Sequence, residues 1–130
     1  MNLLTRHLRS LLLLVSLLFT SPAFAGAELV MVEEHGCPWC ERWNAEISHI
    51  YPKTAVGRAS PLRRIDINQP VPEDIQIARP LRFTPTFMLV VDGVEKARIE
   101  GYPGEDFFWS LYEGLLLQHG IPMDDQTSTN

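Results

Sequence analysis

The stretch LVMVEEHGCPWC, residues 29–40, decides how the rest of this chain is interpreted. It holds the only two cysteines of the 130-residue chain, Cys37 and Cys40, which are separated by Pro38 and Trp39. A disulfide between cysteines this close closes a very small loop, and the stabilisation that a disulfide provides grows with the length of its loop. The pair is therefore interpreted as a redox-active dithiol rather than as a structural cross-link.

Residues 1–25 have the organisation of a secretory signal peptide. A basic start at residues 6–9 precedes an apolar run at 11–19 and a small-residue cleavage site, Ala-Phe-Ala, at 23–25. The apolar run is shorter than the roughly 20 residues that a membrane-spanning helix needs. We therefore expect cleavage after Ala25 and export to a compartment in which disulfides persist.

The remaining 105 residues are close to the usual size of a single domain, about 100–150 residues. The full chain has 11 Lys and Arg and 16 Asp and Glu; two of the basic residues and none of the acidic ones lie in the signal, so nine remain against 16, a net charge of −7. This charge argues against nucleic acid as a partner. We expect one domain over residues 26–122 and a disordered polar tail over 123–130.

Hydrophobic periodicity predicts the element order β-α-β-α-β-β-α. Strands are expected at 28–33, 62–68, 86–91 and 94–100, and helices at 37–51, 71–79 and 104–119. Asp92-Gly93 is a strong hairpin signal between the last two strands. The first two strands are joined through a helix and should be parallel, with a right-handed crossover. The predicted α/β fold is a four-stranded mixed sheet with helices on both faces.

Four landmarks in this order resemble the thioredoxin superfamily. The Cys37–Cys40 motif begins a helix after a strand, Thr84-Pro85-Thr86 opens the third strand where the family has a cis-proline, Asp92-Gly93 forms the hairpin, and Gly101 follows the last strand. The resemblance covers residues 28–120. It implies a minimal thioredoxin-like fold, without the extra N-terminal strand and helix of thioredoxin itself.

At a finer level, the segments HGCPWCERW, YPKT, PLRRIDI, FTPTF and GYPGEDFFW resemble the small exported thioredoxins of bacterial sulfur-oxidation (Sox) systems. This resemblance implies a periplasmic thiol-disulfide oxidoreductase that reduces disulfides of sulfur-oxidation proteins. A membrane thiol-electron transporter would be its donor. No bound cofactor is needed, because the cysteine pair itself carries two electrons. We expect a monomer without stable membrane insertion after cleavage.

Thiol chemistry distinguishes the two cysteines. Cys37 is expected to be the nucleophile, because a helix N-terminus favours its thiolate. Cys40 is expected to resolve the mixed disulfide with the substrate. Thr84 and a cis-Pro85 are expected to leave backbone groups free to pair with an extended substrate segment.

Other residues near the motif receive less specific predictions. Trp39 is expected to be exposed and to contact the substrate. Gly101, just after the last strand, is also expected to contact the substrate. Pro38 and His35 are expected to tune the reduction potential. The pair Arg63-Arg64 is interpreted as a solvated face or a guard of an edge strand.

One position departs from the family pattern. Thioredoxins have a buried acid six residues before the first cysteine, where this chain has Met31. Glu33, Glu34 or His35 could replace it as the proton acceptor for the buried cysteine.

Three alternatives to a disulfide reductase remain open. The first is a disulfide oxidase or isomerase, and the second is a redox-responsive regulatory binding protein. The third is a metal site formed by Cys37, Cys40, His35 and one of the neighbouring glutamates. It is disfavoured because the second ligand pair of a structural zinc site is missing. Covalent haem in its usual form is excluded, because Glu41 stands where C-x-x-C-H needs histidine.

Overall fold

The computed structural model describes residues 26–124 of the chain. Its strands and α-helices are β1 (Ala27–Glu33), α2 (Pro38–Trp43), α3 (Ala55–Ala59), β2 (Leu62–Asp66), β3 (Thr86–Val91), β4 (Val94–Glu100) and α4 (Glu105–Gln118). The expected signal peptide lies outside the described residues, as do residues 125–130 of the expected tail. Met123, the first residue of that tail, packs against the core.

The strands form one mixed sheet in the order β2-β1-β3-β4. β1 runs parallel to β2, whereas β3 is antiparallel to both of its neighbours. Side chains alternate across the central strand β1, so that Leu29 and Met31 face one side and Val30 and Val32 the other, all four fully buried. This arrangement confirms the predicted four-stranded mixed sheet and its parallel first pair.

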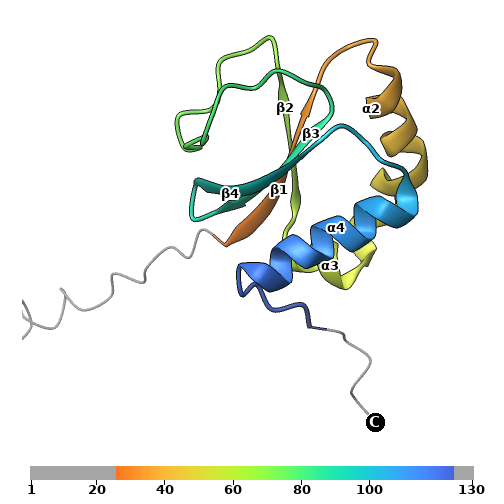
Figure 1. Ribbon diagram of the computed structural model, residues 1–130, viewed down its shortest axis with the longest axis vertical. Helices are drawn as coiled ribbons and strands as arrows, with labels where there is room; N and C mark the ends of the chain where they lie inside the picture. The colour runs from red at the N-terminus through yellow and green to blue at the C-terminus, as the bar shows by residue number, and fades with distance from the viewer. Residues whose placement is uncertain (1–25, 125–130) are drawn as a thin grey trace, which may run out of the picture.

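The three α-helices lie together on one side of the sheet (Figure 1). The core between them and the sheet is rich in aromatic residues. Trp43 of α2 packs against Phe87 of β3, with ring centroids 5.4 Å apart, and Phe108 of α4 lies 4.9 Å from Phe87. Trp43 is fully buried, as expected for a core residue. The helix α2, which follows Cys37 and contains Cys40, is therefore packed against the sheet through Trp43.

The opposite face of the sheet is covered by an irregular segment between β2 and β3 (Figure 1), so the prediction of a helix at 71–79 is wrong. Val71, Ile75 and Ile77 of this segment pack against the face that includes Val30 and Val32. Residues two apart, such as Ile75 and Ile77, point to the same side only in extended chain. The second layer is therefore a loop where a helix had been expected.

Backbone pairing and a buried ion pair attach this segment to β4. Gln76 forms an isolated parallel bridge with Val94. The side chains of Glu95 and Arg98 are ion-paired and only 2% exposed. Arg98 donates to the carbonyl of Arg79 at 2.9 Å, and the Ala78 N–H donates to Glu95 Oε2 at 2.7 Å. These contacts anchor the chain just before it enters the loop with Thr84 and Pro85.

The first helical region is less regular than the predicted helix at 37–51. After α2 the chain continues as a π-helix, Asn44–Ser48, and then as one 3₁₀ turn, Tyr51–Lys53. The helix α3 lies where a loop was expected. It is capped by Thr54, whose Oγ1 accepts from the Gly57 N–H at 3.0 Å. Gly57 permits close packing, because a Cβ there would lie 1.8 Å from the Tyr51 carbonyl oxygen.

Candidate active site

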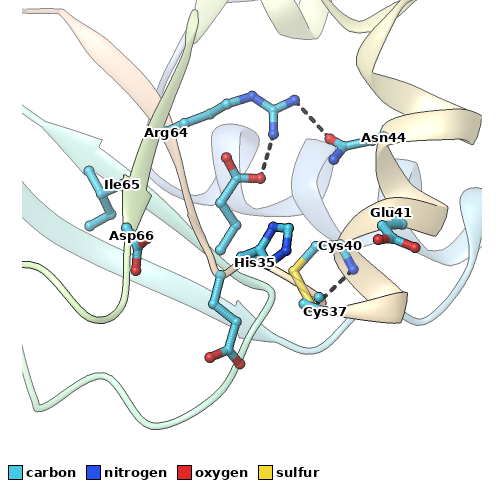
Figure 2. A pocket seen from close by; sticks show the side chains of 11 residues that line it. His35, Cys37, Cys40, Glu41, Asn44, Arg64, Ile65 and Asp66 are labelled. Carbon is cyan, nitrogen blue, oxygen red and sulfur yellow. Dashed lines mark hydrogen bonds and ion pairs between the residues drawn. A yellow bond between two sulfur atoms is a disulfide. The ribbon is translucent and has the colours of Figure 1, made fainter.

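Cys37 and Cys40 form a disulfide at the point where the chain leaves β1 and enters α2 (Figure 2). Their Cα atoms are 5.2 Å apart, and both residues are buried. Cys37 is the N-cap residue of α2, and its Sγ accepts a hydrogen bond from the Cys40 N–H at 3.1 Å. A backbone N–H directed at this sulfur would stabilise negative charge on it in the reduced protein. Pro38 occupies the first helical position, where its missing N–H has no cost.

The loop that opens β3 lies next to Gly101. The Thr84–Pro85 bond is cis, as expected, and Pro85 is buried. The Gly101 N–H donates to the Pro85 carbonyl at 2.8 Å. Gly101 has a φ of 87°, a conformation that favours glycine. The structure thus brings together three residues that the sequence had assigned to substrate binding.

A side-chain hydrogen bond joins this loop to the segment that precedes Cys37. Thr84 Oγ1 donates to Glu34 Oε1 at 2.6 Å. The carboxylate of Glu34 is therefore engaged by the loop that contains Thr84 and Pro85. Nothing in the sequence pointed to this contact, since the two residues are 50 positions apart.

Trp39 is exposed, as predicted, with 53% of its surface accessible. The Arg42 guanidinium lies 5.8 Å from the centre of its ring, a cation–π contact. Arg42 Nε donates to Glu46 at 2.9 Å, and the hydroxyl of Tyr102 donates to the other oxygen of Glu46 at 2.5 Å. The Tyr102 hydrogen bond and then the Arg42 hydrogen bond lower the pKa of Glu46. The i, i+4 spacing of Arg42 and Glu46 could have been found in the sequence, but the contribution of Tyr102 could not.

A pocket of about 340 Å³ adjoins the disulfide and is lined by both cysteines. Figure 2 shows Arg64 reaching into this region from β2, toward Asn44 of the helical segment. The charged or titratable residues of its lining are Glu33, Glu34, His35, Glu41, Arg64 and Asp66. His35 therefore lies in the same pocket as the two cysteines.

The pair Arg63-Arg64 was interpreted as a solvated face or a guard of an edge strand. β2 is an edge strand, but the two arginine side chains have different environments. Arg63 forms a bidentate ion pair with Asp74, at 2.6 and 2.9 Å. Arg64 donates instead to Glu33 and Asn44, and its guanidinium lies over a buried tryptophan. Alternation along β2 places the two arginines on opposite faces of the sheet, and this signal was present in the sequence.

Within residues 26–124, no group of three or more His, Cys, Asp and Glu side chains is arranged to hold a metal ion. No helix in the same part of the chain is long and apolar enough to cross a membrane.

No protein-family model and no curated protein matches the chain. Among solved structures, the chain is similar to the periplasmic thioredoxin SoxS from Paracoccus pantotrophus in its reduced form. The identity is 48% and the TM-score 0.70, and the match covers 72% of this chain and 98% of the SoxS chain. This match confirms the predicted thioredoxin-like fold. The shared fold and the Cys-Pro-Trp-Cys disulfide at the start of a helix show that this chain belongs to the thioredoxin family and is a thiol-disulfide oxidoreductase.

Proposed function

We propose that this protein is a periplasmic reductase of protein disulfides that serves sulfur-oxidation proteins. The observation that carries the proposal is the position of Cys37 Sγ, which accepts the N–H of Cys40 at the start of α2. The similarity to a periplasmic thioredoxin named SoxS supports the location and the class of partner. The signal-peptide pattern of residues 1–25 supports export.

The first half of the reaction uses Cys37. Its thiolate attacks one sulfur of a disulfide in the partner protein, so that a Cys37–partner disulfide forms and the partner's own disulfide breaks. The displaced partner sulfur leaves as a thiolate and takes a proton from water. The N–H of Cys40 stabilises the attacking thiolate through a charge-assisted hydrogen bond.

The second half uses Cys40. Its thiol loses a proton and attacks Cys37 Sγ, which restores the Cys37–Cys40 disulfide and releases the second partner thiolate. The two electrons of the dithiol have then passed to the partner. A membrane thiol-electron transporter would return two electrons and two protons to the pair.

Four residues hold the partner in this proposal. The backbone of Thr84, exposed by the turn at cis-Pro85, pairs with an extended segment of the partner, while Trp39 and Gly101 contact it on either side. The hydrogen bond from Thr84 to Glu34 supports this role, because it limits rotation of the Thr84 side chain. Pro38 and His35 tune the potential from positions next to the cysteines.

Two variants test the roles of the cysteines and the class of partner. Cys40→Ser, expressed in the periplasm, should accumulate disulfide-linked complexes that dithiothreitol dissolves, whereas Cys37→Ser should not. Mass spectrometry of the Cys40→Ser complexes should identify sulfur-oxidation proteins. Equal trapping by the two variants would contradict the assigned roles, and complexes without any sulfur-oxidation protein would contradict the partner class.

A further inference from the structure

We propose that Arg64 and Glu33, which form an ion pair, shift the ionisation of the Cys37–Cys40 dithiol in opposite directions, so that their pairing balances the two effects on the reduction potential. The inference rests on the proposed function only in requiring that this dithiol be redox-active. Neither residue needs to touch the substrate, since both act on the sulfurs across the pocket that they share.

The direction of the Arg64 side chain is fixed by several partners. Nη1 donates to Glu33 Oε2 at 2.7 Å, and Nη2 donates to Asn44 Oδ1 at 2.8 Å and Ser48 Oγ at 2.9 Å. The guanidinium carbon lies 5.6 Å from the centre of the Trp43 ring. Arg64 therefore joins β2 to the end of β1 and to the helical segment after Cys40, and its charge occupies a defined place.

The geometry of β1 directs the Glu33 side chain to this pocket. It lies two residues after Met31 in β1, so the two side chains point to the same face. Met31 is fully buried on that face and is neutral, and its sulfur lies 3.4 Å from Arg64 Nη1. The next residue, Glu34, is engaged by Thr84 instead. Glu33 is thus the carboxylate that is placed to balance Arg64.

The pair shares its pocket with both sulfurs. Cys37, Cys40, Glu33 and Arg64 all line the same pocket of about 340 Å³. The other charged or titratable residues that line it are Glu34 and His35 before the motif, Glu41 on α2 and Asp66 on β2. Arg64 is the one Lys or Arg among the lining residues. The Arg64 and Glu33 side chains are 34% and 27% exposed, so solvent screens their charges less than those of fully exposed groups.

Arg64 and Glu33 have opposite effects on the thiol pKa of the cysteines and on the reduction potential. A nearby cation stabilises a thiolate and lowers the pKa of the thiol, which stabilises the reduced protein and makes the potential less negative. A nearby carboxylate does the reverse. In the intact pair the two effects largely cancel. Removing one member should therefore reveal the effect of the other.

The experiment uses the full-length exported protein and four variants: Arg64→Gln, Glu33→Gln, the double variant and Arg64→Lys. The equilibrium with reduced and oxidised glutathione at pH 7 is measured by alkylation and mass spectrometry, and the thiol pKa by thiolate absorbance. Arg64→Gln should make the protein about threefold to tenfold more reducing and raise the thiol pKa. Glu33→Gln should shift both in the opposite direction by a similar factor. A tenfold change corresponds to about 30 mV.

The double variant and Arg64→Lys are the matched controls. Both should stay within about twofold of the wild type, because the double variant removes both charges and lysine keeps the cation. The shifts of the single variants should shrink in 1 M KCl, where the screening length is about 3 Å. A purely structural role would lower stability without moving the potential in opposite directions.

The outcomes separate this inference from the proposed function. Single variants that shift the equilibrium in the same direction, or that leave it within twofold of the wild type, would overturn the charge-pair inference. If Arg64→Gln does not fold, Glu33→Gln decides by its direction alone. A wild-type protein that does not exchange with glutathione at all would instead overturn the proposed function.

Discussion

The buried ion pair between Glu95 and Arg98 should make this small domain sensitive to the loss of either charge alone. Both side chains are only 2% exposed. Arg98→Met keeps the length and apolar part of the side chain but removes the guanidinium. The Glu95 carboxylate would then remain buried with the Ala78 N–H as a donor, and the Arg79 carbonyl would lose its donor.

The size of the effect follows from leaving one charge unpaired. Breaking a buried ion pair by removing one partner costs about 3–5 kcal/mol. That is a large part of the roughly 5–15 kcal/mol by which domains of this kind are stable. At about 4–8 °C per kcal/mol for a domain near 100 residues, Tm should fall by about 12–40 °C. The double variant Glu95→Gln/Arg98→Met should recover at least half of the loss, because no charge is left buried.

Urea unfolding followed by circular dichroism measures both variants, and hydrogen exchange of the Ala78 amide reports on the segment that Glu95 holds. Lower protection of Ala78 in Arg98→Met is expected. A loss below about 1 kcal/mol in Arg98→Met, or a double variant less stable than the single one, would refute the reasoning.

The same pair predicts how stability depends on pH. Burial alone would raise the pKa of Glu95, but hydrogen bonds from Arg98 and the Ala78 N–H outweigh it, so the pKa lies below its ordinary value. A lowered pKa in the folded state gives stability that is present above the ordinary pKa, about 4.3, and is lost as pH falls through the folded value. The free energy of unfolding, measured from pH 7 to pH 3, should therefore fall more steeply with decreasing pH in the wild type than in the double variant. Equal slopes would contradict this assignment.

Two further predictions concern packing and the contacts around Trp39. Gly57→Ala should cost about 1–3 kcal/mol, because its Cβ would clash with the Tyr51 carbonyl, whereas Gly114→Ala, with open space around it, should gain about 0.5–1 kcal/mol. Urea unfolding measures both, and equal effects would contradict the packing described. Tyr102→Phe should raise the pKa of Glu46 toward its ordinary value, since the Tyr102 hydrogen bond is the main cause of the lowering. Carboxyl NMR titration measures it, and an unchanged pKa would show that this bond is absent in solution.

Local signals in the sequence were sufficient to predict much of the site. The C-x-x-C spacing, the apolar strand before it and the Thr84-Pro85 step each depend on a few adjacent residues. They predicted the position of the disulfide and the exposed Trp39, whereas the cis bond at Thr84-Pro85 was implied by the resemblance to thioredoxins. The sheet followed from alternation and from the Asp92-Gly93 hairpin, where both residues adopt positive φ values.

The remaining features depend on contacts between distant residues. Arg64 meets Glu33 across 31 positions, and Thr84 meets Glu34 across 50. No pattern among neighbouring residues in the sequence predicts either of these contacts. The segment at 71–79 was misinterpreted for a related reason. Its apolar residues are compatible with a helix or an extended chain, and the choice is made by pairing with β4 through Gln76 and Val94.

The reduction potential of the Cys37–Cys40 pair, measured in glutathione and dithiothreitol buffers, tests the central claim most directly. A reductase should lie near the thioredoxin end of the range, at about −270 mV. A value of about −120 mV would make the protein an oxidant and would contradict the proposed reduction of partner disulfides.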